Sequence, residues 1–388
     1  MGRARRSTAR IGIWLALAAV MAAALTVTAY ALTRGSKHPP KRSLAAAIHH
    51  AMASKPVAGV SADFTVSQHL LPGTSSLLDS SPLAGAQGSV WASGDRARLV
   101  VRSQLGTAQV GLDGHTVTLY LPKQHAAYRL ALPKGHADAK PHESGTPSLA
   151  EIRHTLSELG RTLNISGAIA GNVAGQPAYT VRISSRHDSG LIGPLAVAFD
   201  AAHGTPLRVA LYPRGSSTPA IALQVSHIHY GAVPASQTAL KLPSGTHVTR
   251  VHLPSKAEIT HAMTHAQRST HSSAAAVTSA APASLAGMPR TAARELSSAK
   301  AGNGLLAVYG HGLGAVVVIE HAMTGGRSHA GAPSSSSMLP SVRINGARGN
   351  ILQTTLGTIV TFDRGGKQFV VLGARPVSTI LAAARALP

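Results

Sequence analysis

The chain has 388 residues, with 36 basic and 14 acidic side chains, a formal net charge of +22, no cysteine and only 3% aromatic residues. The absence of cysteine excludes disulfides, thiol catalysis and cysteine–zinc sites, and the shortage of aromatic residues means that the core is aliphatic. The basic residues are scattered and not interleaved with aromatics, which argues against nucleic-acid binding; attraction to anionic lipids or cell-wall polymers and an arginine-rich source genome both fit the charge.

A long apolar run follows the basic N-terminus. Ile11–Leu32 contains 22 residues without a charge, enough for a helix that crosses a membrane. Arginines precede the run, so the positive-inside rule makes residues 1–10 a cytoplasmic stub and sends the body, after a spacer at 33–42, out of the cytoplasm. Ala29–Ala31 has the small-x-small form that a signal peptidase accepts, so both a single-pass membrane protein and a secreted protein remain open.

The segment after the spacer predicts a helix and then antiparallel strands. Ser43–Lys55 has a plausible N-cap in Ser43, and from Val57 apolar and polar residues alternate with period two. Gly94-Asp95 and Asp113-Gly114 indicate hairpin turns. The strands predicted here lie at 57–67, 87–92, 96–103, 107–112, 115–121 and 126–130.

A second helix, Ser148–Leu163, interrupts the strands and begins with a capping box of Ser148 and Glu151. Strand patterns resume at 168–173, 178–184, 195–200, 206–212, 220–225 and 227–230. A sheet with so few helices must curl to bury its apolar face. We therefore predict an α+β fold in which residues 43–250 form a curved antiparallel half-barrel with a helical lid over a hydrophobic cavity; an ordinary packed core is the alternative.

Several short motifs resemble those of one superfamily. Residues 111–122 (GLDGHTVTLYLP), 175–181 (GQPAYTV), 198–209 and 242–245 (LPSG) follow, in order and spacing, the pattern of the outer-membrane lipoprotein carrier (LolA-like) superfamily. Its relatives include lipid-binding lipoproteins and the RseB/MucB-like regulators, which bind an anti-sigma factor in the envelope stress response. The resemblance implies a hydrophobic ligand held between the sheet and the helices.

Two functions follow from this resemblance. The first is a membrane-anchored, extracytoplasmic protein that binds a lipid or an acylated lipoprotein, although the anchor and the extra C-terminal domain differ from a freely shuttling carrier. The alternative is an envelope-stress regulator that binds a membrane anti-sigma factor. Both make the membrane a partner.

We expect the ligand to contact the apolar side chains of the sheet, with the helix Ser148–Leu163 as part of the lid. Charged substitutions at Leu119 and Phe199 are expected to abolish binding. The candidate ligand-binding residues are Phe64, Val66, Val90, Val117, Leu119, Val181, Ile183, Val197, Phe199, Val209 and Leu211.

The remainder of the chain is predicted to be a low-complexity linker at 251–291 and a small α+β domain at 292–388. The linker histidines His261, His265 and His271 lack the further ligands of a metal motif, so no metal site is predicted. The C-terminal segment resembles a small domain that is common in exported proteins of Gram-positive, actinobacterial-type bacteria.

Nothing in the sequence indicates an enzyme. No G-x-S-x-G elbow is present. Asp95, Asp113 and Asp200 lie where turn chemistry already explains an aspartate. We predict neither catalysis nor a cofactor.

Overall fold

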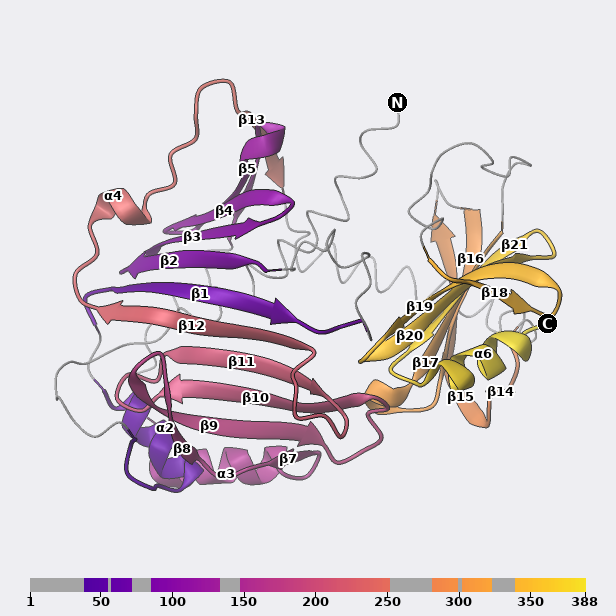
Figure 1. Cartoon of the computed structure of the whole chain (residues 1–388), viewed down its shortest axis with the longest axis horizontal. Coiled ribbons are helices and arrows are strands. Elements are labelled where there is room, and N and C mark those ends of the chain that lie inside the picture. The colour runs from indigo at the N-terminus through magenta and orange to yellow at the C-terminus, as the bar shows by residue number, and fades with distance from the viewer. Residues whose placement is uncertain are drawn as a thin grey trace.

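The computed structural model describes residues 38–54, 57–71, 85–132, 147–251, 281–298, 302–322 and 339–388. In these ranges the chain forms two sheets with few helices (Figure 1). The predicted apolar helix Ile11–Leu32 lies outside the described residues, so the anchor stays a prediction. No helix within the described ranges is both long enough and apolar enough to cross a bilayer.

The large sheet is built from two runs of consecutive strands that meet where β1 pairs with β12. Its order is β13-β6-β5-β4-β3-β2-β1-β12-β11-β10-β9-β7, with β8 paired to β9. The strands are β1 (Val60–Gln68), β2 (Gln87–Ser93), β3 (Arg96–Ser103), β4 (Gly106–Asp113), β5 (Thr116–Leu121), β6 (Ala126–Ala131), β7 (Leu163–Ile165), β8 (Ile169–Val173), β9 (Gln176–Ser185), β10 (Ile192–Asp200), β11 (Pro206–Pro213), β12 (Ile221–Tyr230) and β13 (His247–Val251).

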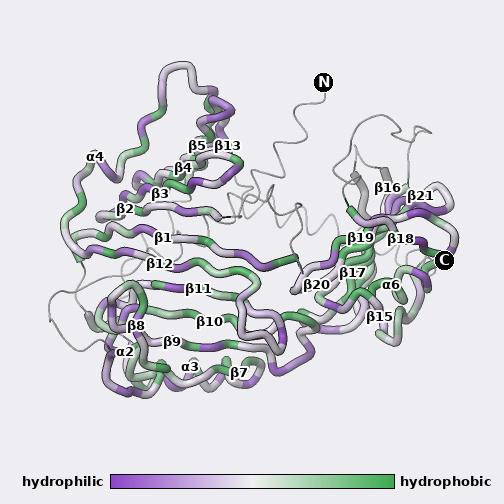
Figure 2. Tube along the Cα trace, in the orientation of Figure 1, coloured by the Kyte–Doolittle hydropathy of each residue, from purple (hydrophilic) through white to green (hydrophobic). Residues whose placement is uncertain are grey.

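The large sheet is open, not closed into a barrel, because β13 and β7 lie at opposite edges. The predicted hairpins form, and their turns use glycines with positive φ, Gly94 at 58° and Gly114 at 55°. β13 was not predicted; it returns to pair in parallel with β6. Figure 2 shows hydrophobic and hydrophilic residues mixed along the strands, as expected for a sheet whose two faces differ.

Two helices lie at the β7–β9 edge of this sheet (Figure 1). α2 (Leu44–Met52) is capped by Ser43, and α3 (Leu149–Leu159) begins with the predicted Ser148–Glu151 capping box. α3 is shorter than predicted because Leu163–Ile165 leaves the helix to pair with β9 as β7. Ile152 is its only buried residue, so α3 packs on α2 and leaves most of the sheet without the predicted helical lid. A short helix, α4 (Ala235–Thr238), packs on β2 and β3.

The smaller sheet forms a second core with a closing helix. Its order is β14-β15-β16-β17-β21-β20-β19-β18, and α6 (Val377–Arg385) packs on β20, β21 and β18. The first two strands begin inside the segment predicted as linker, where Leu285 is buried in the core. The strands are β14 (Ser284–Leu285), β15 (Met288–Ser298), β16 (Gly302–Tyr309), β17 (Val316–Ala322), β18 (Ser341–Ile344), β19 (Ala347–Thr354), β20 (Gly357–Arg364) and β21 (Lys367–Gly373).

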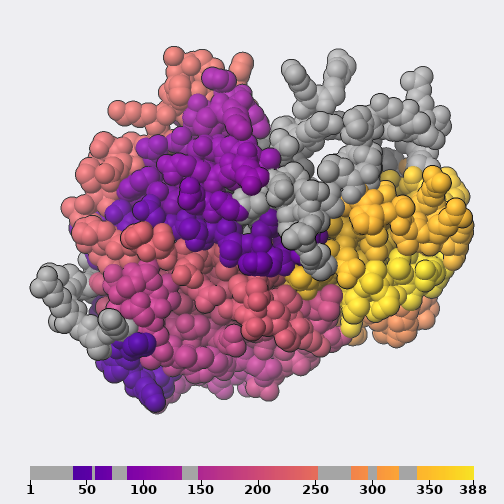
Figure 3. Space-filling model, viewed as in Figure 1, coloured from indigo at the N-terminus to yellow at the C-terminus, as the bar shows by residue number. Residues whose placement is uncertain are grey.

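The two sheets belong to domains that touch directly (Figure 3). The backbone N–H of Leu191 donates to the carbonyl of Ala374 at 2.7 Å, and the N–H of Thr355 donates to the carbonyl of Leu70 at 2.6 Å. The Thr355 hydroxyl also donates to the carbonyl of His69 at 3.0 Å. The junction therefore lies at the ends of β1 and β9–β12 that point toward the C-terminal domain.

Candidate ligand-binding face

All eleven predicted ligand-binding residues lie on one face of the large sheet. A row of directly opposite residues runs from Leu119 on β5 across β4 and β3 to Val90 on β2. A second row of directly opposite residues runs from Val66 on β1 across β12, β11 and β10 to Val181 on β9. Residues two apart on a strand share a face, which connects the remaining candidates to these rows. The period-two pattern therefore identified a real face, although the ligand itself stays a prediction.

Burial divides this face into a packed part and a partly exposed part. Phe64, Val66, Val90, Leu119 and Val181 are all at most 6% exposed. Three of them form one core cluster with Leu99 and Val101, and Leu119 packs with Ala108 and Leu121. The partly exposed candidates are Val117, Ile183, Val197, Phe199, Val209 and Leu211.

The packing around Leu119 changes what a charged substitution at this residue can test. Leu119 is 1% exposed in a tight cluster, so a charged substitution there would disrupt folding before it could report on a ligand. Phe199 packs with Tyr179, whose ring centroid is 5.9 Å away, in the cluster that Ala47 of α2 completes. The partly exposed candidates of β9–β11 outside this cluster, Ile183, Val197, Val209 and Leu211, are therefore the positions that can test ligand binding.

We define the aliphatic face as two adjacent rows of side chains that cross consecutive strands. The outer row is Ile165, Ile183, Leu195, Leu211 and Ile221, and the inner row is Val181, Val197, Val209, Leu223 and Val66. Eight of these ten residues are partly exposed; Val181 and Val66 are buried. Each row crosses five strands, a span of about 19 Å at about 4.8 Å per spacing.

Four members of the aliphatic face were not among the predicted site residues. They are Ile165, Leu195, Ile221 and Leu223. The alternation along β10 and β12 indicated the face of Leu195, Ile221 and Leu223. Ile165 carried no such signal, because it lies between the predicted helix, which ends at Leu163, and the next predicted strand, which begins at residue 168.

One polar side chain ends the outer row. Gln68 pairs with Ile221 across β1 and β12, on the same face as Val66. Both its amide nitrogen and its amide oxygen are buried, and neither has a hydrogen-bond partner in the described part of the chain. The sequence offered no signal for this, because a glutamine at the end of a strand is ordinarily solvated.

A buried polar cluster lies at the far end of β10 and β12. The Asp200 carboxylate accepts hydrogen bonds from the backbone N–H groups of Ala202 and His203, both at 2.8 Å, and from the Tyr230 hydroxyl at 3.0 Å. Its Oδ1 lies 3.0 Å from Nδ1 of His203, whose ring stacks on Tyr230. Burial opposes ionisation, but the hydrogen bonds and charge of His203 outweigh it and hold the pKa of Asp200 below its usual range.

This cluster stabilises the turn between β10 and β11. Burial and the neighbouring carboxylate raise the pKa of Tyr230, so the phenol stays protonated and donates to Asp200. Within the described ranges, no group of three or more histidine and acidic side chains is arranged to hold a metal ion. The linker histidines His261, His265 and His271 lie outside those ranges.

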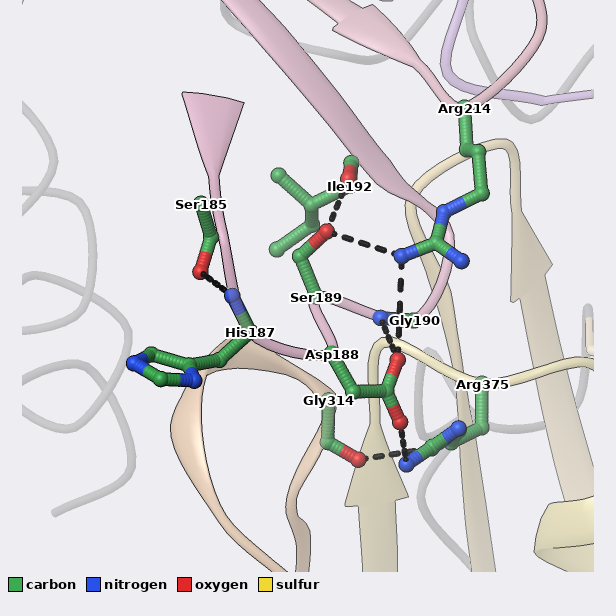
Figure 4. A network of polar contacts seen from close by, with 9 residues as sticks. All are labelled: Ser185, His187, Asp188, Ser189, Gly190, Ile192, Arg214, Gly314 and Arg375. Atoms are coloured by element: carbon green, nitrogen blue, oxygen red, sulfur yellow. Dashed lines mark hydrogen bonds and ion pairs between the residues drawn. The ribbon is translucent and has the colours of Figure 1, made fainter. Parts of the chain in front are cut away.

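A second polar network joins the two domains (Figure 4). Oδ1 of Asp188 accepts from the N–H of Gly190 at 2.9 Å and lies 3.7 Å from Arg214, while Oδ2 accepts from Arg375 of the C-terminal domain. Arg375 also donates from Nε to the carbonyl of Gly314 at 2.6 Å. These contacts place the C-terminal domain beside the end of the aliphatic face.

Comparison with known proteins identifies no family. No protein-family profile matches the chain, and no curated protein matches it. Among solved structures, MucB in complex with MucA from Pseudomonas aeruginosa matches with 16% identity over 88% of this chain and 94% of that one, at a TM-score of 0.40. A LolA-superfamily protein from Nitrosomonas europaea matches with 7% identity over 52% of this chain and 99% of that one, at a TM-score of 0.24.

These similar structures come from the same group that the sequence motifs resemble. At such identities and with TM-scores below 0.5, they establish neither an activity nor a partner for this chain. The source organism and the relatives of the C-terminal domain likewise stay predictions.

Proposed function

We propose that the protein binds an acyl chain, of a lipid or of an acylated lipoprotein, on its aliphatic face. One observation carries the proposal: eight of the ten side chains in two adjacent aliphatic rows, each of which crosses five strands, remain partly exposed beside a packed core. Neighbouring apolar side chains that stay partly exposed on one face are typical of ligand-binding sites. A row of about 19 Å accommodates one acyl chain, since the chains of one leaflet span about half of a 30 Å bilayer core.

The place of action in this proposal is the outer side of the cytoplasmic membrane. The run Ile11–Leu32 would tether or export the body, and the net charge of +22 would hold it near anionic headgroups. A tethered protein takes its ligand from the membrane or from a neighbouring protein. Catalysis is not part of the proposal.

The test is lipid analysis of the full-length protein. We would purify it from membranes of an expressing host, extract it with organic solvent and quantify acyl species by mass spectrometry. Leu211→Glu, at a partly exposed position of the outer row, places a carboxylate against the chain and should reduce bound lipid at least tenfold. Gln224→Glu is the matched control, because Gln224 is exposed on the opposite face of β12.

The same measurements also give the outcomes that would contradict acyl-chain binding. A wild-type protein without stoichiometric lipid, or a folded Leu211→Glu protein that keeps its lipid, would contradict the proposal. Circular dichroism and thermal unfolding would establish that both variants are folded before the lipid content is compared.

The alternative is an envelope-stress regulator whose partner is a membrane anti-sigma factor. One similar structure is a complex of MucB with MucA, and for this reason we retain the regulator as the second candidate function. Crosslinking in intact membranes separates the two functions. A single-pass anti-sigma factor crosslinked to the aliphatic face of a lipid-free protein would favour the regulator.

A further inference from the structure

Gln68 occupies an unusual position at the end of the outer row. Four aliphatic residues in succession, from Ile183 to Ile221, lead across β9–β12 to this one amide. Its nitrogen and oxygen are both buried without a hydrogen-bond partner among the described residues. A leucine or methionine would continue the row without this defect.

The backbone on the C-terminal side of Gln68 is held in place. The N–H of His69 donates to the carbonyl of Ala220 at 2.7 Å, and its ring Nδ1 lies 3.2 Å from the carbonyl of Pro219. The carbonyls of His69 and Leu70 both accept from Thr355 of the C-terminal domain. The backbone that follows Gln68 is therefore fixed at the domain junction.

A buried amide without partners is unfavourable, and folded proteins rarely keep one. Two donor hydrogens and one acceptor oxygen of Gln68 are unused. Because the amide lies in line with an aliphatic row, a ligand that fills the row would bring its own polar end to the amide.

We propose that Gln68 recognises the polar head of the acyl ligand, and this inference rests on the proposed function. Nε2 donates a hydrogen bond to the carbonyl oxygen of a carboxyl, ester or amide group, and the hydrocarbon chain then runs along the outer row toward Ile165. The ligand class is thus a fatty acid or a fatty-acyl derivative, and a hydrocarbon without a carbonyl is discriminated against. The site also sets the direction in which the chain lies.

The test compares two probes of equal chain length, methyl palmitate and hexadecane. Each would displace a fluorescent apolar dye, 1-anilinonaphthalene-8-sulfonate, from the full-length protein. Wild-type protein should bind methyl palmitate about tenfold more tightly than hexadecane, the size of effect expected from one buried hydrogen bond. Gln68→Met keeps the length of the side chain, removes the amide and should bind the two probes equally. Gln224→Met, on the opposite face, should retain the tenfold preference.

Thermal unfolding without ligand supplies a second readout. Gln68→Met should unfold at the same temperature as wild type or higher, because it removes a buried polar group that has no hydrogen-bond partner. A preference for methyl palmitate that survives in folded Gln68→Met would overturn the assignment of Gln68 and leave the proposed function standing. A wild-type protein that binds neither probe would overturn both. If Gln68→Met and Gln68→Leu both fail to fold, the amide is structural and the assignment is wrong.

Discussion

At the scale of single residues, Asp200 shows how burial and hydrogen bonding together decide a protonation state. The carboxylate is 1% exposed, yet hydrogen bonds from three neighbours satisfy both of its oxygens. A buried carboxylate without those donors would have a raised pKa. Here the donors prevail, the group stays ionised, and the turn between β10 and β11 is held closed around it.

The lowered pKa of Asp200 makes stability depend on pH. The folded pKa lies below the unfolded value of about 3.9, so the stabilisation is complete above pH 4 and is lost as the pH falls through the folded pKa. Asp200→Asn should be destabilised at pH 7, and the difference from wild type should narrow below pH 4. Thermal unfolding of both proteins between pH 2 and 7 measures this. A difference that stays constant across the range would show that the charge of Asp200 is not involved.

At the scale of elements, α3 shows that a helix can be well capped and yet contribute little to the core. The Ser148 hydroxyl accepts from the N–H of Glu151 at 3.2 Å, and the Glu151 carboxylate accepts from the N–H of Ser148 at 2.7 Å. Ile152 is its one buried residue, and Leu159 is 44% exposed. The helix is therefore stabilised by its own first turn and by α2.

Removal of the cap should act locally. Ser148→Ala should destabilise the helix by about 1 kcal/mol. Amide hydrogen exchange in α3 should accelerate several-fold, while exchange in β9–β12 and the global unfolding temperature stay near wild type. Ser157→Ala, later in the same helix, serves as the control. Faster exchange throughout the large sheet would contradict the view that α3 lies outside the core.

At the scale of the whole molecule, the two domains are held together by a few close contacts. Gly190 has φ +60°, and a Cβ at this position would lie 1.7 Å from the carbonyl oxygen of Ala374. Asp188 accepts from Arg375 beside it, and the N–H of Gly190 together with Arg375 and Arg214 lowers the pKa of that carboxylate. The domain junction therefore requires glycine at this turn.

Substitution of this glycine should separate the domains. Gly190→Ala should abolish the hydrogen bond from Leu191 to Ala374, since the new methyl group cannot fit. Calorimetry should resolve two unfolding transitions, and small-angle scattering should show a larger radius of gyration. Gly175→Ala, also at positive φ but with no atom near its Cβ, controls for backbone strain alone. Unchanged scattering of Gly190→Ala would show that other contacts hold the domains.

The sequence by itself determined the local architecture. Period-two alternation placed eleven scattered residues on one face, since every second side chain of a strand points the same way. Glycine turns and the Ser148 capping box identified hairpins and a helix start, because these depend on residues close together in the chain. The same patterns could not tell Leu119 from Leu211, although one is packed and the other partly exposed.

Only the tertiary structure decided which parts of that face are filled. Burial depends on pairing between distant segments, such as β1 with β12, and no local period encodes those partners. For the same reason three features had no sign in the sequence: the parallel pairing of β13 with β6, the buried Gln68 amide without a hydrogen-bond partner, and the Asp188–Arg375 contact. Each arises because the fold brings together, or leaves unpaired, groups far apart in the chain.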